Sequence, residues 1–201
     1  DPVNRRLQLS SGHTIGYDVL SINQEPTPDR AEIEATMPGA RENALMLHPL
    51  ENFTQLWPQV VALAQERAIH VVLLGPGLLG AELALAAAHA LAAPHGSRVT
   101  LLTGGQPLLA GVNPALGRRM AQRLHAAGIT VLEQACSGFS RGQVHLAGPD
   151  GIARTQLACD APIVAPRTPA LRWLAHSGML LDNHGSVVVN PRLQVESHRQ
   201  V

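Results

Sequence analysis

The chain has 201 residues, of which 45% are apolar, 2% aromatic and 15% charged. This composition supports a packed core and excludes a disordered chain, and the length suits one domain with appendages. The formal net charge is 0, with 15 basic and 15 acidic residues, so no basic surface is expected for nucleic acid or an anionic membrane. No uninterrupted apolar run is long enough for a transmembrane helix or a signal peptide, and we expect a cytoplasmic protein.

The cysteines and histidines form no pattern typical of redox or metal chemistry. Cys136 and Cys159 are not part of a CxxC pair, so we expect two half-buried thiols in a reducing compartment, with a disulfide as the alternative. None of the 10 histidines belongs to an HxH, HxxxH or HExxH motif. The sequence therefore predicts no metal site.

The amino-terminal part predicts a hairpin followed by turns. Polar and apolar residues alternate on both sides of SSG, which predicts strands at 5–9 and 13–22 with a turn at 10–12. The stretches NQEPTPDR, at 23–30, and MPGA, at 37–40, have the composition of turns.

Residues 50–67 predict an amphipathic helix. We expect Pro58 to split or kink it, because proline lacks the N–H that an interior helical position donates. The predicted apolar face consists of Phe53, Leu56, Val60, Leu63 and Ala64.

Residues 69–133 predict three buried strands that alternate with two helices. Short apolar runs predict the strands at 69–75, 98–103 and 129–133, and longer stretches predict helices at 78–92 and 114–127. An alternation of this kind implies a parallel sheet with right-handed crossovers.

The ends of both helices carry local signals. Asn113 followed by Pro114 is typical of a helix start, with a side-chain cap and a proline at the first position. Gly128 predicts a left-handed stop for the same helix. Pro94 and Gly96 are expected to end the first helix.

The carboxyl-terminal third predicts shorter elements. GQVHLAGPDGIARTQLAC reads as a hairpin that turns at 149–151, and APIVAP predicts a buried strand at 161–165. PALRWLAHSG predicts a short helix that Gly178 ends, and GSVVVN predicts a last strand at 185–190.

The loop between the first buried strand and its helix has the spacing G-x-G-x-x-G, formed by Gly75, Gly77 and Gly80. Gly75 permits a tight turn, Gly77 lets a pyrophosphate approach the backbone, and Gly80 lets the helix pack closely on the strand. The N–H groups of Leu78 and Leu79 and the helix dipole would then face the phosphates. The sequence predicts a dinucleotide-binding fold.

Two positions near this loop leave alternatives open. Glu82 either stabilises the helix dipole or points toward the nicotinamide. The second strand ends in Thr103, Gly104, Gly105 and Gln106, where an acidic residue would select NAD and a nearby arginine would select NADP. The threonine hydroxyl and the glycine N–H groups are candidate donors to either ribose.

Several segments resemble the FAD-dependent pyridine nucleotide-disulfide oxidoreductases, a family that includes type II NADH dehydrogenases. They are YDVLSI, MPGA, GPGLLGAE and the final segment from Cys159 to Val201. HPLENFTQLWPQV and LLTGGQPLLAG are more similar to the branch associated with selenide, water dikinase, which shares the Thr-Gly-Gly. Departures from the family pattern are INQEPTP at 22–28, APR at 165–167 and Asn190.

The resemblance implies an internal fragment of a larger flavoprotein. Residues 1–48 would be partial flavin-domain strands and a linker, 49–165 a three-layer Rossmann-like α/β domain with a β-meander, and 166–201 a return to the incomplete FAD domain. The parent would pass a hydride from NAD(P)H to FAD, and this fragment alone would be inactive. Glu82 and Ala165 would lie near the nicotinamide side.

The sequence offers no catalytic residue and leaves a second hypothesis open. A degenerate Rossmann module used for assembly or regulation would have its loop filled by side chains such as Leu78. The predicted partners are a small-molecule cofactor and, through apolar surface that the missing flavin half would cover, a second copy. The parent enzyme would lie in the cytoplasm or at the membrane surface.

Overall fold

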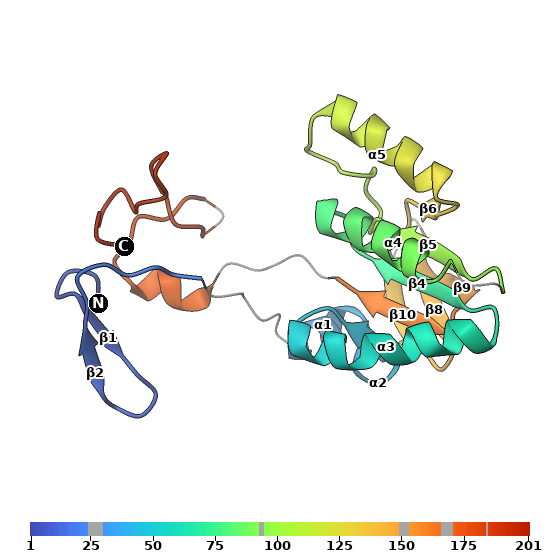
Figure 1. Cartoon of the computed structure of the whole chain (residues 1–201), viewed down its shortest axis with the longest axis horizontal. Helices are drawn as coiled ribbons and strands as arrows, with labels where there is room; N and C mark the ends of the chain where they lie inside the picture. Colours follow the sequence, from blue (N-terminus) through green and yellow to red (C-terminus); the bar gives the residue numbers. More distant parts are fainter. Residues whose placement is uncertain (24–29, 93–94, 149–152, 166–170, 184) are drawn as a thin grey trace. The chain divides into compact units, whose positions relative to one another are not determined.

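The computed structural model describes residues 1–23, 30–92, 95–148, 153–165, 171–183 and 185–201. The chain forms two compact units (Figure 1). One unit joins Asp1–Thr27 with Thr168–Val201, and the other is Pro28–Arg167. The expected domain divisions after residues 48 and 165 concern a parent enzyme and stay a prediction.

The larger unit is built on a five-stranded parallel sheet of order β3-β10-β4-β5-β6. Three of its strands are the predicted βαβαβ strands, and the predicted strand at 161–165 joins them beside β4. The sequence did not predict β3, which has only two residues. The strands are β3 Leu45–Met46, β4 His70–Leu74, β5 Arg98–Leu102, β6 Thr130–Leu132 and β10 Ala161–Val164.

The central strand β4 is buried on both faces. Val71 and Leu73 belong to one hydrophobic core, and Val72 and Leu74 belong to a second core on the opposite face. Successive side chains of a strand point to opposite faces, so a continuous apolar run fills both cores. The run HVVLL therefore requires covering layers on both sides of the sheet.

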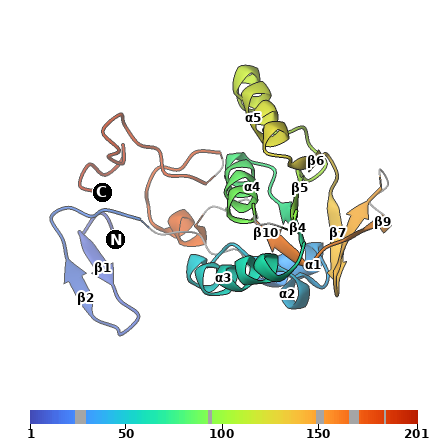
Figure 2. The ribbon, with the colours of Figure 1, turned by 45° about the vertical axis from the view of Figure 1, so that its right-hand side comes forward.

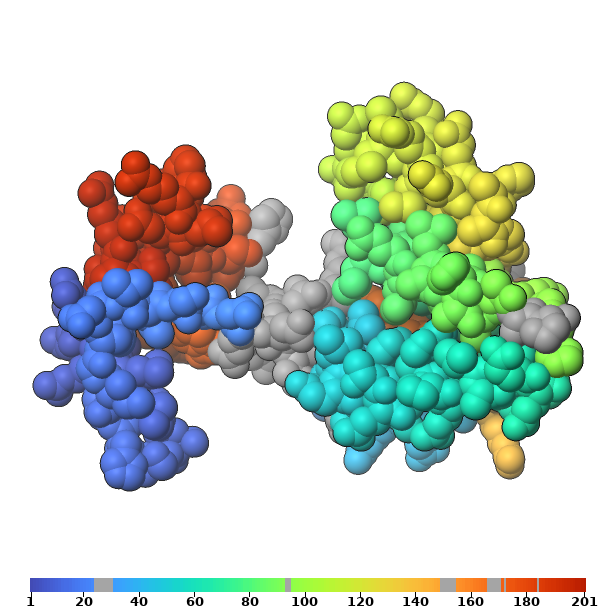
Figure 3. All heavy atoms as spheres, in the orientation of Figure 1, coloured from blue at the N-terminus to red at the C-terminus, as the bar shows by residue number. Residues whose placement is uncertain are grey.

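Three helices cover one face of the sheet: α3 Leu50–Glu66, α4 Leu78–Ala90 and α5 Pro114–Ala126 (Figures 2 and 3). Of the two effects predicted for Pro58, the split was wrong, because α3 continues through this exposed proline, and the kink stays a prediction. In the predicted apolar face, Phe53 and Ala64 are buried and Leu56 is 44% exposed.

The predicted ends of α5 are confirmed. The side chain of Asn113 accepts a hydrogen bond of 2.9 Å from the backbone N–H of Ala115, and Pro114 is the first helical residue. Gly128 has a φ of 70°, the left-handed conformation that ends a helix. These local signals set the first and last residues of α5, the helix that connects β5 to β6.

An antiparallel sheet and two short helices cover the other face. The sheet has the order β7-β8-β9. Strands β8 and β9 confirm the predicted hairpin, whose turn at 149–151 lies outside the described residues. The MPGA turn is confirmed, with Gly39 at a φ of 80°. The elements are β7 Cys136–Ser140, β8 Gln143–Ala147, β9 Ala153–Ala158, α1 Arg30–Thr36 and α2 Ala40–Asn43.

These layers make the larger unit a three-layer, Rossmann-like α/β fold with a β-meander, as the sequence predicts. Helices pack on one side of the parallel sheet, and the antiparallel sheet packs on the other. Within the described ranges, no helix is both long and apolar enough to cross a membrane.

The smaller unit contains the predicted hairpin in a shorter form. Its strands are β1 Arg6–Gln8 and β2 Thr14–Gly16, so the second strand is shorter than the predicted 13–22. The predicted short helix is a 3-10 helix, η1 Arg172–His176. The prediction of a strand at 185–190 was wrong, because this segment makes only isolated bridges, such as Val189 with Val195. The turn predicted at 23–30 falls largely outside the described residues.

Candidate dinucleotide site

A hollow of about 280 Å³ lies at the carboxyl edge of the parallel sheet. It is bounded by residues at the carboxyl ends of β4, β5 and β10, and by Thr36 and Met37 at the end of α1. Open α/β sheets bind ligands at this edge. Its lining is Thr36, Met37, Leu74, Gly75, Pro76, Leu102, Gly104, Ala135, Cys136, Val164 and Ala165.

Gly75 and Gly80 hold the strand and the helix together. A Cβ on Gly75 would lie 2.9 Å from the Cα of Gly80. A Cβ on Gly80 would press on the carbonyl of Gly75, 2.7 Å from its carbon atom. Only residues without side chains allow this approach, so both glycines are required by packing.

Gly77 differs from the other two glycines of the loop. No described atom lies within 4 Å of the position that a Cβ would take, and Gly77 is exposed. Packing therefore does not require a glycine here. The open space lies beside the first turn of α4, where a pyrophosphate would contact the backbone.

The first turn of α4 leaves its backbone donors available. In the part of the chain that the structure describes, the N–H groups of Leu78, Leu79 and Gly80 have no hydrogen-bond acceptor. The side chains of Leu78 and Leu79 are 42% and 46% exposed and do not line the hollow. The helix dipole adds a partial positive charge at the same place.

Ala165 closes the hollow beside Gly75. Its N–H donates a 2.8 Å hydrogen bond to the carbonyl of Leu74, which continues the pairing of β10 with β4. Its Cβ lies 3.4 Å from the position that a Cβ on Gly75 would take. A larger side chain at 165 would narrow the hollow.

Thr103 is fully buried at the end of β5, and its polar groups are bonded within the protein. Its hydroxyl donates to the carbonyl of Gln106, and its N–H donates to the carbonyl of Leu132. The N–H of Gly104 donates to the carbonyl of Gln134. Two of the donors expected to serve a ribose, the Thr103 hydroxyl and the Gly104 N–H, thus bond within the protein, and their role at a ribose stays a prediction.

Glu82 is not brought to the hollow. It lies on the exposed side of α4 and lines a groove between α4 and α5 together with Leu116, Arg119 and Arg123. The residues that the structure does bring together are Gly75, Gly104 and Ala165, with the glycine loop at their side. The role of Glu82 at a nicotinamide stays a prediction.

The sequence did not single out Cys136 as a residue of this hollow. It begins β7 and is half-buried, and burial raises the pKa of its thiol to about 11. Burial raises the pKa of the Cys159 thiol to about 12. Both cysteines are free, and among the described residues no three His, Cys, Asp or Glu side chains could hold a metal ion.

The opposite, amino edge of the sheet carries a closed polar network around His70. Its Nδ1 donates to the carbonyl of Ala158 at 2.7 Å, and its Nε2 accepts from the Thr100 hydroxyl at 2.8 Å. Asp160 accepts from the His70 N–H at 2.8 Å and from Arg67 at 2.6 Å. Burial lowers the pKa of His70. Burial alone would raise the pKa of Asp160, but the hydrogen bonds from Arg67 and from the His70 N–H hold this pKa below its ordinary value.

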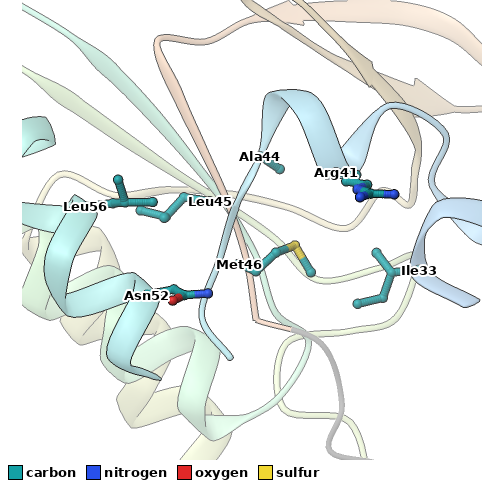
Figure 4. A pocket seen from close by; sticks show the side chains of 7 residues that line it. All are labelled: Ile33, Arg41, Ala44, Leu45, Met46, Asn52 and Leu56. Carbon is teal, nitrogen blue, oxygen red and sulfur yellow. The ribbon is translucent and has the colours of Figure 1, made fainter. Parts of the chain in front are cut away.

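A smaller hollow of about 150 Å³ lies beside the edge strand β3 (Figure 4). Leu45, Met46 and Leu56 form much of its wall, and the polar side chains are those of Arg41 and Asn52. It has no glycine-rich loop. The hollow at the carboxyl edge is therefore the better candidate for a dinucleotide.

Residues 30–201 match the family described as pyridine nucleotide-disulphide oxidoreductase. No curated protein has a sequence that matches this chain.

Among solved structures, the chain is similar to the sulfide:quinone oxidoreductase from Aquifex aeolicus, with 19% identity and a TM-score of 0.71. It is also similar to the ferredoxin reductase for the CYP199A2 system from Rhodopseudomonas palustris, with 22% identity and a TM-score of 0.67. A third is NDH2 from Plasmodium falciparum in complex with NADH, with 12% identity and a TM-score of 0.63. At these identities the likeness supports the fold. The similarity covers 100% of this chain but only 48%, 46% and 46% of those chains, so the chain spans about half their length.

Proposed function

This chain belongs to the pyridine nucleotide-disulphide oxidoreductase family, and we propose that it supplies the NAD(P)H-binding part of a flavin-dependent oxidoreductase. The observation that carries the proposal is the open loop at Gly77, beside the hollow and the free N–H groups of α4. A pyrophosphate needs such donors and close access to the backbone. The residues present therefore fit a dinucleotide.

The residues proposed to hold the cofactor act by binding and orientation. The N–H groups of Leu78, Leu79 and Gly80 would bind the pyrophosphate, and Gly77 would leave it room. Gly75, Gly104 and Ala165 would shape the hollow beside it. The redox chemistry belongs to the cofactors, a hydride donated by NAD(P)H and accepted by FAD in the parent enzyme.

The smaller unit, Asp1–Thr27 with Thr168–Val201, is proposed to be a piece of the flavin domain. The predicted flavin-domain segments were 1–48 and 166–201, but α1, α2 and β3 of the first segment pack into the larger unit, which is proposed to bind the nicotinamide cofactor. Large apolar side chains of the smaller unit are strongly exposed, among them Val19 at 79% and Leu193 at 80%. Both residues line one groove of that unit, and contiguous apolar surface marks an interaction site. The likeness to the branch associated with selenide, water dikinase rests on sequence motifs alone.

The alternative of a degenerate module is less well supported. It requires a loop filled by side chains such as Leu78. Leu78 instead projects outward, and the space at Gly77 is open. A loop kept only for its structure would also not need a glycine at position 77, because nothing packs against it.

The test is a calorimetric titration of NADH into the wild-type chain and into Gly77→Val. We expect weak binding by the wild type and a loss of at least about tenfold in affinity for Gly77→Val, since its branched side chain takes the place of the pyrophosphate. Thermal unfolding of both proteins serves as the control, and their midpoints should agree. Equal binding by a folded Gly77→Val, or no binding by a folded wild type, would refute the proposal.

A further inference from the structure

We infer that this site binds NADH and NADPH with nearly equal affinity, because the loop after β5 presents backbone and no charged side chain to the adenosine ribose. The inference rests on the proposed function and specifies its cofactor. It concerns residues 103–106, all of which the structure describes.

The first support is the inward position of Thr103. This is the residue that stands where an acidic side chain would bind the ribose 2′-hydroxyl and repel a 2′-phosphate. Thr103 is 0% exposed, and its hydroxyl donates to the carbonyl of Gln106. The side chain therefore closes the loop on itself and cannot contact a ribose.

The second support is the backbone of the two glycines that follow. Gly104 and Gly105 have φ values of 73° and 79°, which side chains rarely adopt. A Cβ at Gly104 would meet no described atom within 4 Å, so there is room for a phosphate. The loop conformation thus keeps this place free of side chains.

The third support concerns the arginines of α5, the helix that follows this loop. Arg119 lines the groove between α4 and α5 together with Glu82, and it does not line the hollow at the end of β5. Arg118 is exposed on the same helix and lines neither that groove nor the hollow. Glu133 follows β6 at the same edge as Thr103, and it is the carboxylate that a test must exclude.

The 2′-phosphate of a bound NADPH would therefore remain in solvent, and no charged side chain of this loop would attract or repel it. We expect the dissociation constants for NADH and NADPH to agree within about threefold, since specificity needs a favourable or a repulsive group. A site with an acidic residue in this place would favour NADH strongly.

The experiment compares both cofactors on the wild-type chain, on Gly104→Asp and on Gly104→Asn by calorimetry. Aspartate and asparagine tolerate positive φ best among residues with side chains, so both variants should fold. Gly104→Asp should weaken NADPH relative to NADH by about tenfold, because its carboxylate repels the 2′-phosphate. Gly104→Asn matches its size without charge and should keep the wild-type ratio.

The outcomes separate the two proposals. Binding of neither cofactor by the folded wild type overturns both. Binding of NADH at least about tenfold more tightly than NADPH overturns the inference and leaves the proposed function intact; Glu133→Gln would then show whether that carboxylate is responsible. The inference is also overturned if the wild-type chain binds both cofactors equally but Arg118→Ala prefers NADH. Arg118 would then bind the 2′-phosphate of NADPH.

Discussion

The two edges of the parallel sheet are built from the same five strands and are used in opposite ways. At the amino edge, the His70 ring donates to the Ala158 carbonyl and accepts from the Thr100 hydroxyl, and Asp160 accepts from the His70 N–H and from Arg67. At the carboxyl edge, the first turn of α4 leaves its N–H groups without acceptors in the described structure. The polar groups around His70 are therefore paired within the protein, whereas the N–H groups of the first turn of α4 are available to a ligand.

The direction of the chain explains this difference. Every strand of a parallel sheet ends at the same edge, and the helix that follows begins there with free N–H groups and the positive end of its dipole. The amino edge receives helix ends instead, so its polar groups must be paired by side chains such as Asp160. Substitutions at one edge should therefore leave the other edge unchanged.

The largest effect is expected from Gly80→Ala. Its Cβ would press on the carbonyl of Gly75, so α4 must move away from β4. We expect a loss of about 2–3 kcal/mol in the free energy of unfolding, although alanine has the better helix propensity. Urea unfolding measures it.

The matched control is Gly77→Ala in the same loop, where the Cβ position is open. Its stability should change by less than about 0.5 kcal/mol. Similar losses for both variants would show that the loop is uniformly packed and contradict the open site.

A smaller loss is expected at the amino edge from Asp160→Ala. The change removes the acceptor of the His70 N–H and the partner of Arg67. We expect a loss of about 1–2 kcal/mol in the free energy of unfolding, because the change removes a charged acceptor in a partly buried place. The affinity for NADH should stay unchanged, because the candidate site lies at the opposite edge.

Arg67→Gln is the control for the ion pair alone. The Arg67 side chain is 53% exposed, so its removal should cost less than about 1 kcal/mol. A marked drop in NADH affinity in Asp160→Ala would mean that the two edges are coupled and not independent.

The pH dependence of stability should report on His70. Burial lowers its pKa below the ordinary 6.5, so the unfolded chain binds more protons between the folded value and 6.5. The unfolding free energy should therefore rise with pH through that window and level off above it. His70→Gln should remove this part of the slope in denaturant unfolding at several pH values, and an unchanged slope would mean that other groups cause it.

The smallest expected effect is a difference between the two cysteine thiols in their rate of alkylation. Cys136 lies at the carboxyl edge with a pKa raised to about 11, and Cys159 at the amino edge with one raised to about 12. Both should react slowly with iodoacetamide at pH 8, and Cys136 should react faster, since the thiolate is the reactive form. NADH should slow the alkylation of Cys136 and leave that of Cys159 unchanged, as measured by mass spectrometry of each cysteine. Slower alkylation of Cys159 alone would contradict this prediction.

The sequence by itself determined the core of the fold and the glycine loop. The runs at β4 and β5, the cap at Asn113 and the stop at Gly128 act within a few residues, so their meaning does not depend on distant parts of the chain. The spacing of Gly75, Gly77 and Gly80 is equally local, and it located the turn where α4 begins.

The tertiary structure decided which side chains face the candidate site. The sequence did not indicate that Thr103 turns inward, that Glu82 lines a groove beside α5, or that Cys136 borders the hollow. Each of these depends on a neighbour that comes later in the chain: β6 for Thr103, α5 for Glu82, and β10 for the hollow itself. A local pattern can specify a turn, but the direction of a side chain is fixed by the elements that pack around it.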